Sequence, residues 1–328
     1  MAKKDFGLVV VGNALVDILS QESDGFIKAH KGMQKGAMNL IDTERGHQIY
    51  DAMGPATEMS GGSVANSLSV FASFGGSGVF IGKIADDEFG EVFSHDLKAQ
   101  GITFTTKPYQ GDLQTGRSYI VVTPDKQRTM NTYLGASTEI SETDIDEELI
   151  VRSEILLLEG YLMDKPKAKQ AFKKAASFAK QHGTKVAFTL SDHNCVGRHH
   201  QEFMDLVRND VDILIGNEEE IQALTLTETF EDAAQMASGL SEIAVLTKGK
   251  DGALIINNGE RYEIPTFPPE KIVDTTGAGD AFAGGVLYGF SAGMTPDEAG
   301  VLGAKAASKT ISHIGARNPD TKFKALLP

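Results

Sequence analysis

The sequence predicts an α/β protein with a mostly parallel sheet, helices on both of its faces and a small β-rich lid. Short apolar runs alternate with amphipathic helical patterns along most of the chain, which is typical of a buried parallel sheet. Two stretches break this rhythm and have the alternating pattern of lid strands. Distinctive polar and glycine residues follow several predicted strands, and parallel sheets bind their ligands at that edge.

Composition limits the classes of function. The chain has 328 residues, 41% of them hydrophobic and 23% charged, as in soluble globular proteins. A formal net charge of −14 argues against a nucleic-acid partner. The single cysteine, Cys195, excludes an internal disulfide, and the eight histidines show no metal-ligand spacing. The apolar run Leu8–Val11 is too short to span a membrane, so we expect no membrane association and a cytoplasmic location.

The first 140 residues predict a core interrupted by lid segments. Leu8–Val11 is typical of a buried strand, whereas residues 18–60 are less regular and contain lid-like strands such as 37–41. A glycine pair opens a predicted helix at 63–74, before a strand at 79–81 and a helix at 89–99. Strands then follow from residue 102, and those at 117–123 and 128–134 flank the hairpin turn Pro124–Gln127.

The remainder alternates strands and helices. Strands are predicted at 155–158, 186–190, 211–215 and 243–246. Helices are predicted at 165–181, with Asp164 as cap and Pro166 in the first turn, and at 230–237 and 296–311. We therefore expect a large domain from residues 1–13, 59–101 and 137–328, and a discontinuous lid from 14–58 and 102–136.

The run Asp274–Gly285 gives the strongest signal for a catalytic site. Gly277 and Gly279 permit a tight turn and a close backbone approach to a ligand, and a helical pattern follows from residue 281. The first N–H groups of a helix favour an anion. Asp280 would lie beside that anion and take a proton from an attacking hydroxyl. The alternative is that Asp280 only stabilises the helix start.

Several residues directly follow predicted strands, namely Asn13, Asp17, Gly160, Asp192, Asn217 and Gly249. Asp17 could accept two hydrogen bonds from a sugar diol, and the alternative is an Asx turn or a helix cap. The segment Asn217–Glu220 offers the oxygen ligands that Mg²⁺ prefers, and the alternative is a helix N-terminus capped by Asn217.

Two motifs resemble the signatures of the ribokinase-like carbohydrate and nucleoside kinases, the PfkB family. Residues 274–287 are similar to the family's C-terminal signature, and Gly-Gly-Ser-Val-Ala-Asn at 61–66 is similar to its N-terminal signature. The motifs lie in the family's order, and the resemblance covers essentially the whole chain. It implies a ribokinase-like fold and an enzyme that phosphorylates a primary hydroxyl of a small molecule with ATP.

The resemblance also implies residue roles. Asp280 would be the catalytic base, and the N–H groups of Gly277, Ala278 and Gly279 would form an anion hole. The acceptor would be bound by Asn13, Asp17, Gly62 and Asn66, with the pair Gly61-Gly62 as a lid hinge. ATP would lie against Thr247, Gly249 and Gly252, and Asn217 and Glu220 would organise Mg²⁺ through water.

Two more positions follow from the resemblance. Arg128 is similar to a lid arginine that reaches the transferred phosphate; Arg117 is the competing candidate, and a surface role is the alternative for both. The segment Gly315-Ala316 is similar to one that supplies carbonyl ligands to a monovalent cation such as K⁺. Asp274 and Thr276 would lie on the cation's other side.

Similarity of short segments to particular members of the family indicates which acceptor substrate to expect. Residues 12–18, 188–191 and 211–220 are most similar to the adenosine kinases of the family, and lid residues could cover a base, namely Met33, Met38, Leu40, Tyr133 and Leu134. Ribokinase or a fructokinase-type sugar kinase is the alternative. A non-catalytic nucleotide- or sugar-binding protein is the second alternative. The oligomeric state stays open.

Overall fold

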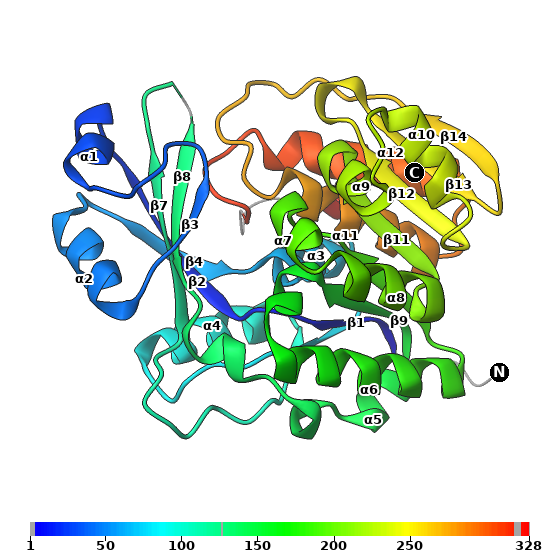
Figure 1. The fold of residues 1–328 in the computed structure, drawn as a ribbon, viewed down its shortest axis with the longest axis horizontal. Helices are drawn as coiled ribbons and strands as arrows, with labels where there is room; N and C mark the ends of the chain where they lie inside the picture. The colour runs from blue at the N-terminus through cyan, green and yellow to red at the C-terminus, as the bar shows by residue number, and fades with distance from the viewer. Residues whose placement is uncertain (1–3, 126, 318–322, 328) are drawn as a thin grey trace.

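The computed structural model describes residues 4–125, 127–317 and 323–327. Within them the strands form two sheets of unequal size (Figure 1). The small sheet lies with α1 (Asp24–Ala29) and α2 (Thr43–Ala52) at one end of the molecule, and the large sheet with its helices forms the rest. The predicted α/β class, with a mostly parallel sheet and a second, smaller sheet, is confirmed. The predicted turn at 124–127 includes Lys126, which lies outside the described residues.

The large sheet has the strand order β14-β13-β12-β11-β10-β9-β1-β5-β6. From β12 to β6 neighbouring strands are parallel, whereas β13 and β14 are antiparallel. The strands are β1 (Phe6–Val11), β5 (Gly78–Ile81), β6 (Thr103–Phe104), β9 (Ser153–Glu159), β10 (Lys185–Thr189), β11 (Ile213–Asn217), β12 (Ile243–Thr247), β13 (Ala253–Asn257) and β14 (Glu260–Ile264).

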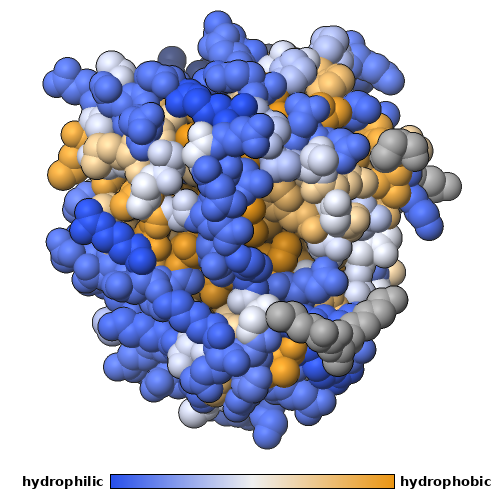
Figure 2. Space-filling model, turned by 90° about the vertical axis from the view of Figure 1, so that its right-hand side faces the viewer, coloured by the Kyte–Doolittle hydropathy of each residue, from blue (hydrophilic) through white to orange (hydrophobic). Residues whose placement is uncertain are grey.

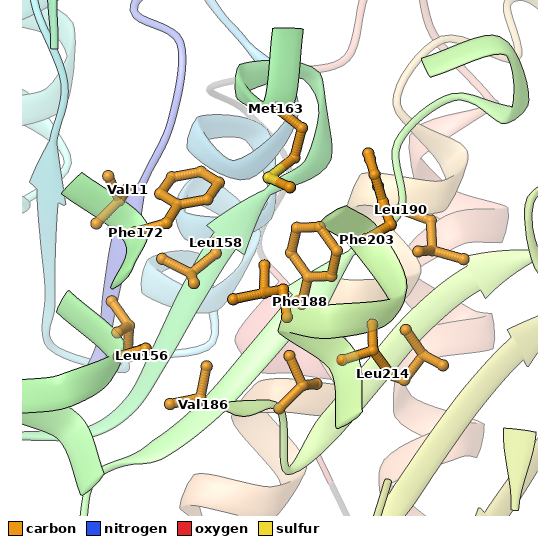
Figure 3. Packing of buried hydrophobic residues seen from close by; sticks show 14 of the residues in the cluster. Val11, Leu156, Leu158, Met163, Phe172, Val186, Phe188, Leu190, Phe203 and Leu214 are labelled. Atoms are coloured by element: carbon orange, nitrogen blue, oxygen red, sulfur yellow. The ribbon is translucent and has the colours of Figure 1, made fainter. Parts of the chain in front are cut away.

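Both faces of this sheet are covered because its strands are apolar on both sides. In β1, Val9 and Val11 pack into one hydrophobic cluster, whereas Leu8 and Val10 pack into the other. Figure 3 shows the first cluster, in which the rings of Phe188 and Phe203 pair and Phe172 lies beside Val11. The helices that contribute to this face are α5 (Glu147–Val151), α6 (Pro166–His182), α7 (His193–Arg198), α8 (His200–Asp210), α9 (Glu218–Thr225) and α10 (Phe230–Ala237).

The opposite face carries the helices that position the site. They are α3 (Ser63–Ser73), α4 (Glu88–Ala99), α11 (Ala278–Ser291) and α12 (Pro296–Thr310). Helices α3 and α11 approach closely because Gly284 has no side chain: a Cβ there would lie 2.4 Å from the carbonyl oxygen of Ser67. This close packing brings the first turns of α3 and α11 together.

The small sheet has the order β3-β8-β7-β2-β4. Its strands are β2 (Leu15–Gln21), β3 (Met38–Leu40), β4 (Thr57–Gly61), β7 (Gly116–Val122) and β8 (Arg128–Tyr133). Strands β7 and β8 form the predicted antiparallel hairpin. The less regular segment 18–60, in which only lid strands were predicted and no helix was named, also contains α1 (Asp24–Ala29) and α2 (Thr43–Ala52). The side chain of Asp42 caps α2, and Ile49 is buried against the sheet, which explains this second helix.

Three further expectations need correction. Strand β4 runs across the predicted boundary between residues 58 and 59, so the small sheet, which corresponds to the predicted lid and is called the lid sheet below, extends to Gly61. Strand β6 lies after residue 102 but pairs with β5, so the large sheet includes it. Asp164 does not cap α6, because its carboxylate instead accepts hydrogen bonds from Arg198 and pairs with His199.

Figure 2 shows the end of the molecule away from the small sheet. Hydrophilic side chains predominate on this face, and apolar residues are visible between them. Among the described residues, no helix combines the length and apolar character that crossing a membrane requires.

Candidate active site

A cavity of about 410 Å³ lies between the lid sheet and the carboxyl ends of the parallel strands. Predicted site residues from distant parts of the chain line it together: Asn13, Asp17, Gly62, Asn66, Arg128, Asn217, Glu220, Thr247, Gly249, Thr276, Gly277, Ala278, Gly279 and Asp280. Gly252, Asp274 and Gly315 are not among the lining residues. These residues are far apart in the sequence, and the arrangement of the two sheets brings them together.

The lid forms its wall of the cavity from two rows of side chains. Cross-strand pairing places four lining residues in one row: Asp17, Ser118, Thr132 and Leu40. Two residues further along the strands, a second row contains Ile120, Met130 and Met38. Residues two apart on a strand share a face and lie about 7 Å apart. The wall is therefore polar near Asp17 and apolar one step beyond it.

Asp17 lies inside lid strand β2, not just beyond a core strand as predicted. Its buried carboxyl lies against Gly61, where a Cβ would come within 2.3 Å of the Asp17 Cγ atom. Burial raises the pKa of Asp17 to about 7, and the positive charges of Arg317 and Arg128 oppose that rise. A hydroxyl-rich ligand would replace the water that burial removes from this carboxylate.

Asp280 lies in the first turn of α11, as predicted, although the helix begins at Ala278. Its two carboxylate oxygens accept hydrogen bonds from Ser63 Oγ at 2.7 Å and from Asn66 Nδ2 at 2.9 Å. Burial raises the pKa of Asp280, and these two hydrogen bonds oppose the rise. A raised pKa makes a carboxylate a stronger base. The arrangement suits proton transfer at Asp280 while α3 holds its orientation.

The turn before α11 leaves room for an anion. Gly277 is the N-cap with φ of 72°, and a Cβ there would lie 2.6 Å from the Cβ of Ala316. At Gly279, apart from its chain neighbours and the nearby backbone of α11, no described atom lies within 4 Å of the position a Cβ would take. Among the described residues, the Gly279 N–H has no hydrogen-bond acceptor. Open space beside the unpartnered Gly279 N–H fits a phosphoryl group, whereas the Ala278 N–H donates to the Thr275 carbonyl oxygen at 3.4 Å.

Glu159 is a buried lining residue that the sequence analysis missed. It is the last residue of β9, and its carboxylate accepts hydrogen bonds from Asn13 Nδ2, the Asn13 N–H and the Val64 N–H. Ser137 Oγ also donates to Asn13 Oδ1 at 2.8 Å. Asn13 is therefore fixed from both ends. A glutamate at the end of an apolar strand, Leu-Leu-Leu-Glu, is the signal that could have identified it.

We expect Glu159 to make stability depend on pH. Burial raises its pKa to about 7, from the 4.5 of an exposed glutamate. Between these values the folded protein holds a proton that the unfolded chain has released, so raising the pH from 5 to 8 destabilises the fold. The Glu159→Gln variant should lose on the order of 1–3 kcal/mol of that pH dependence. Urea unfolding at pH 5 and pH 8 measures it, and an unchanged pH dependence would contradict this assignment.

Asn217 and Glu220 combine a structural role with a position in the cavity. Asn217 Oδ1 accepts from the Glu220 N–H at 2.9 Å, and the Glu220 carboxylate accepts from the Asn217 N–H and Nδ2, which forms a capping box at α9. Burial raises the pKa of Glu220 to about 7. Among the described residues, no cluster of three or more histidine, cysteine or acidic side chains could hold a metal. The Glu220 carboxylate lines the cavity, so a water-mediated contact with Mg²⁺ stays a prediction.

The segments predicted to bind the nucleotide and a monovalent cation lie in a turn after β12 and around Asp274. The turn 249–251 joins β12 to β13 with Gly252 at φ of 93°, and Thr247 ends β12 at the cavity. Asp274 accepts hydrogen bonds from Thr276 N–H and Oγ1 and from the Gly315 N–H. The three candidate cation ligands thus lie together, with the Asp274 carboxylate already bonded to donors.

The two lid arginines differ in position. Arg128 lines the cavity, whereas Arg117 is buried against Phe89 and Tyr133 and does not line it. Of the apolar lid residues predicted to cover a base, Met38, Leu40 and Leu134 line the cavity. Met33 and Tyr133 are instead buried in the lid and do not line it, because they pack against its other side chains.

Other lining residues that sequence reasoning missed include Ser63, Tyr161, Arg198 and Ser191. Ser63 follows the glycine pair directly, so its place at the helix start was a usable signal. Arg198 and Tyr161 carry no such signal, because short helices after β9 and β10 bring them to the cavity.

Comparison with known proteins identifies the family. A family model described as pfkB family carbohydrate kinase matches residues 38–322. The chain is 30% identical over 270 residues to a 5-dehydro-2-deoxygluconokinase from Geobacillus kaustophilus, covering 78% of this chain and 80% of that protein.

Two solved structures are more similar. An adenosine kinase from Sinorhizobium meliloti is 42% identical, with a TM-score of 0.93 and coverage of 99% of this chain and 98% of that one. A probable sugar kinase from Rhizobium etli is also 42% identical, with a TM-score of 0.93 and coverage of 98% of both chains. An adenosine kinase from Schistosoma mansoni with 2-fluoroadenosine is 22% identical with a TM-score of 0.85, covers 95% of this chain and 97% of that one, and shares the fold.

Proposed function

The chain belongs to the pfkB family of carbohydrate kinases and is a phosphotransferase with an alcohol group as acceptor, and we propose that this acceptor is the 5′-hydroxyl of adenosine. The apolar row of the lid, next to the row that contains Asp17, is the observation that carries the proposal. Similarity at 42% identity to an adenosine kinase supports it.

The two rows match the two halves of a nucleoside. Asp17, Ser118 and Thr132 offer a carboxylate and two hydroxyls, which suit the hydroxyls of a ribose. Ile120, Met130 and Met38 lie one step further, where a base attached to that ribose would pack. Leu40, which ends the polar row, is 57% exposed, a large apolar surface for a cavity wall. A free sugar would leave these apolar side chains in water.

In the proposed reaction, Asp280 accepts the proton of the 5′-hydroxyl. A carboxylate has about four lone-pair sites, so Asp280 can accept this third hydrogen bond beside those from Ser63 and Asn66. The hydroxyl oxygen then bonds to the γ-phosphorus of ATP while the bond to the β,γ-bridging oxygen breaks, and ADP leaves. The N–H groups at Gly277–Gly279, together with Arg128 from the lid, would stabilise the transferring phosphoryl group.

The donor would lie along the other half of the cavity. Thr247 and Gly249 would contact ATP, with Gly252 shaping the turn beside them. Glu220 and Asn217 would hold the water shell of Mg²⁺, which neutralises phosphate charge when bound. Asp274, Thr276 and Gly315 are the proposed surroundings of a monovalent cation. The lid and the large domain, as proposed from the sequence, would close over both substrates.

A substrate panel tests the acceptor. Covering about 100 Å² of apolar surface at about 25 cal/mol per Å² stabilises a complex by about 2.5 kcal/mol, or nearly two orders of magnitude. We therefore expect kcat/KM with ATP to be far higher for adenosine than for ribose. Inosine, guanosine, fructose and 5-dehydro-2-deoxygluconate complete the panel. A preference for any of the free sugars or sugar acids would overturn the adenosine assignment and favour the sugar-kinase alternative, which the curated relative supports.

A substitution in the apolar row tests whether the lid causes the expected preference for adenosine over ribose. Met130→Ala removes apolar contact area beside the proposed base, so we expect kcat/KM for adenosine to fall by about 5- to 20-fold, with little change for ribose. Met236→Ala is the matched control, because Met236 is 44% exposed on α10 and does not line the cavity. Equal losses for both acceptors would show that Met130 does not contact a base.

A further inference from the structure

Arg317 is a buried cation that neither the family motifs nor the proposed reaction uses. It follows the loop after α12 and is 8% exposed. Its guanidinium donates three hydrogen bonds: Nε to Asn66 Oδ1 at 2.8 Å, one terminal nitrogen to Ser60 Oγ, and the other to the Gly61 carbonyl oxygen at 3.3 Å. A buried arginine held by three acceptors is an unusual feature in a protein interior.

These acceptors lie on both sides of Gly62, in the glycine pair that the resemblance implies is a lid hinge. Ser60 and Gly61 end β4 of the lid sheet, whereas Asn66 lies in the first turns of α3. Between them, Gly62 has φ of 98°, and a Cβ there would lie 2.3 Å from the Asn13 carbonyl oxygen. The chain can therefore bend sharply at Gly62, and Arg317 bridges the bend.

Both functional carboxylates are linked to this bridge. Asn66 donates from its other end to Asp280 Oδ2 at 2.9 Å, so Arg317 orients the amide that orients the proposed base. Asp17 lies directly against Gly61, whose carbonyl accepts from Arg317. The positive charge of Arg317 also acts on both carboxylates. Ser60 is anchored further by its N–H to Asp96 Oδ2 at 2.9 Å.

We propose that Arg317 is a positioning residue that fixes the lid strand carrying the hinge to the helix that orients Asp280, and so keeps the acceptor-binding carboxylate and the base in register. It acts through Asn66 and Gly61 and touches neither substrate. The inference rests on the proposed function for the roles of Asp17 and Asp280. Arginine is required because only its planar fork reaches three acceptors in fixed directions.

The test separates this role from simple structural support. Arg317→Lys keeps the charge but not the fork, and Arg317→Met removes both. Ser60→Ala removes one lid-side partner with little volume change, and remains informative if the other two variants fold poorly. Arg152→Met is the control, because Arg152 is a half-exposed surface arginine in ion pairs with Asp5 and Glu148. The kcat of each variant is calculated per folded enzyme molecule, and circular dichroism measures the folded fraction.

For Arg317→Lys and Arg317→Met we expect kcat to fall by about 10- to 100-fold and the acceptor KM to rise, because small misplacements of reacting groups have effects of this size. The KM for ATP should stay within about 2-fold, since the donor side of the cavity is not bridged. Ser60→Ala should show the same pattern with a smaller loss. Folded variants with wild-type kcat and acceptor KM, or with equal rises in both KM values, would overturn the proposal.

Each assay uses whichever acceptor the wild-type enzyme phosphorylates best. A wild-type preference for a sugar would thus refute adenosine as substrate while leaving the result for Arg317 interpretable. Conversely, normal kinetics in folded Arg317 variants with adenosine as the best acceptor would refute only the positioning role.

Discussion

Asp280→Asn should lower kcat by about two to four orders of magnitude, the usual contribution of a general base. The amide cannot accept the hydroxyl proton at neutral pH, although its oxygen can still accept a hydrogen bond from Ser63. The KM for ATP should change little, because the proposed anion site at Gly279 would consist of backbone N–H groups that the substitution leaves in place. Steady-state kinetics with varied ATP and saturating acceptor measure both effects.

A matched control addresses the alternative that Asp280 only stabilises its helix. Asp297 is an exposed acid in the first turn of α12, as Asp280 is in α11. Asp297→Asn should reduce stability slightly through the helix dipole and leave kcat unchanged. If Asp280→Asn behaved in the same way, Asp280 would be a helix-stabilising residue and the proposed mechanism would be wrong.

The pattern of strands and helices was largely predictable because its signals are local. Continuous apolar runs such as Val9–Val11 and Leu156–Leu158 are the signature of strands buried on both faces, and they pair directly in the sheet. Helix α2 was not predicted because its stabilisation comes from one capping side chain and from Ile49 packing on a sheet built elsewhere in the chain. Tertiary contacts of that kind leave little trace in a periodicity.

Only those residues of the candidate site that belong to a local sequence motif were predicted. The helix N-terminus at Gly277–Asp280 is a local feature, so the turn and the place of Asp280 followed from the residues. Glu159 and Arg317 have no such motif, because their importance depends on buried hydrogen bonds to Asn13 and Asn66, residues more than 100 positions away. The misplacement of Asp17 has the same cause: whether Leu15 starts a new strand depends on its partners in the lid sheet.

The second large effect concerns Asp17. Asp17→Ala should lower kcat/KM for the acceptor by about two to four orders of magnitude, because two hydrogen bonds from sugar hydroxyls to a buried carboxylate contribute about 1.5–3 kcal/mol each. The KM for ATP should remain within about 2-fold, since Asp17 lies on strand β2 of the lid sheet, whereas Thr247 ends strand β12 of the large sheet. Asp125→Ala is the control, because this lid carboxylate is half-exposed and pairs with Lys35.

The acceptor's own hydroxyls provide the sharper form of this test. If Asp17 binds the ribose diol, 2′-deoxyadenosine and 3′-deoxyadenosine should each lose activity with the wild-type enzyme and lose little further activity in Asp17→Ala, because the hydrogen bond is already absent. Such non-additivity assigns the bond to one pair of groups. Fully additive losses would place the diol elsewhere in the cavity, for example on Ser118 or Thr132 of the same row, and would assign the effect of Asp17 to the charge balance with Arg317 and Asp280.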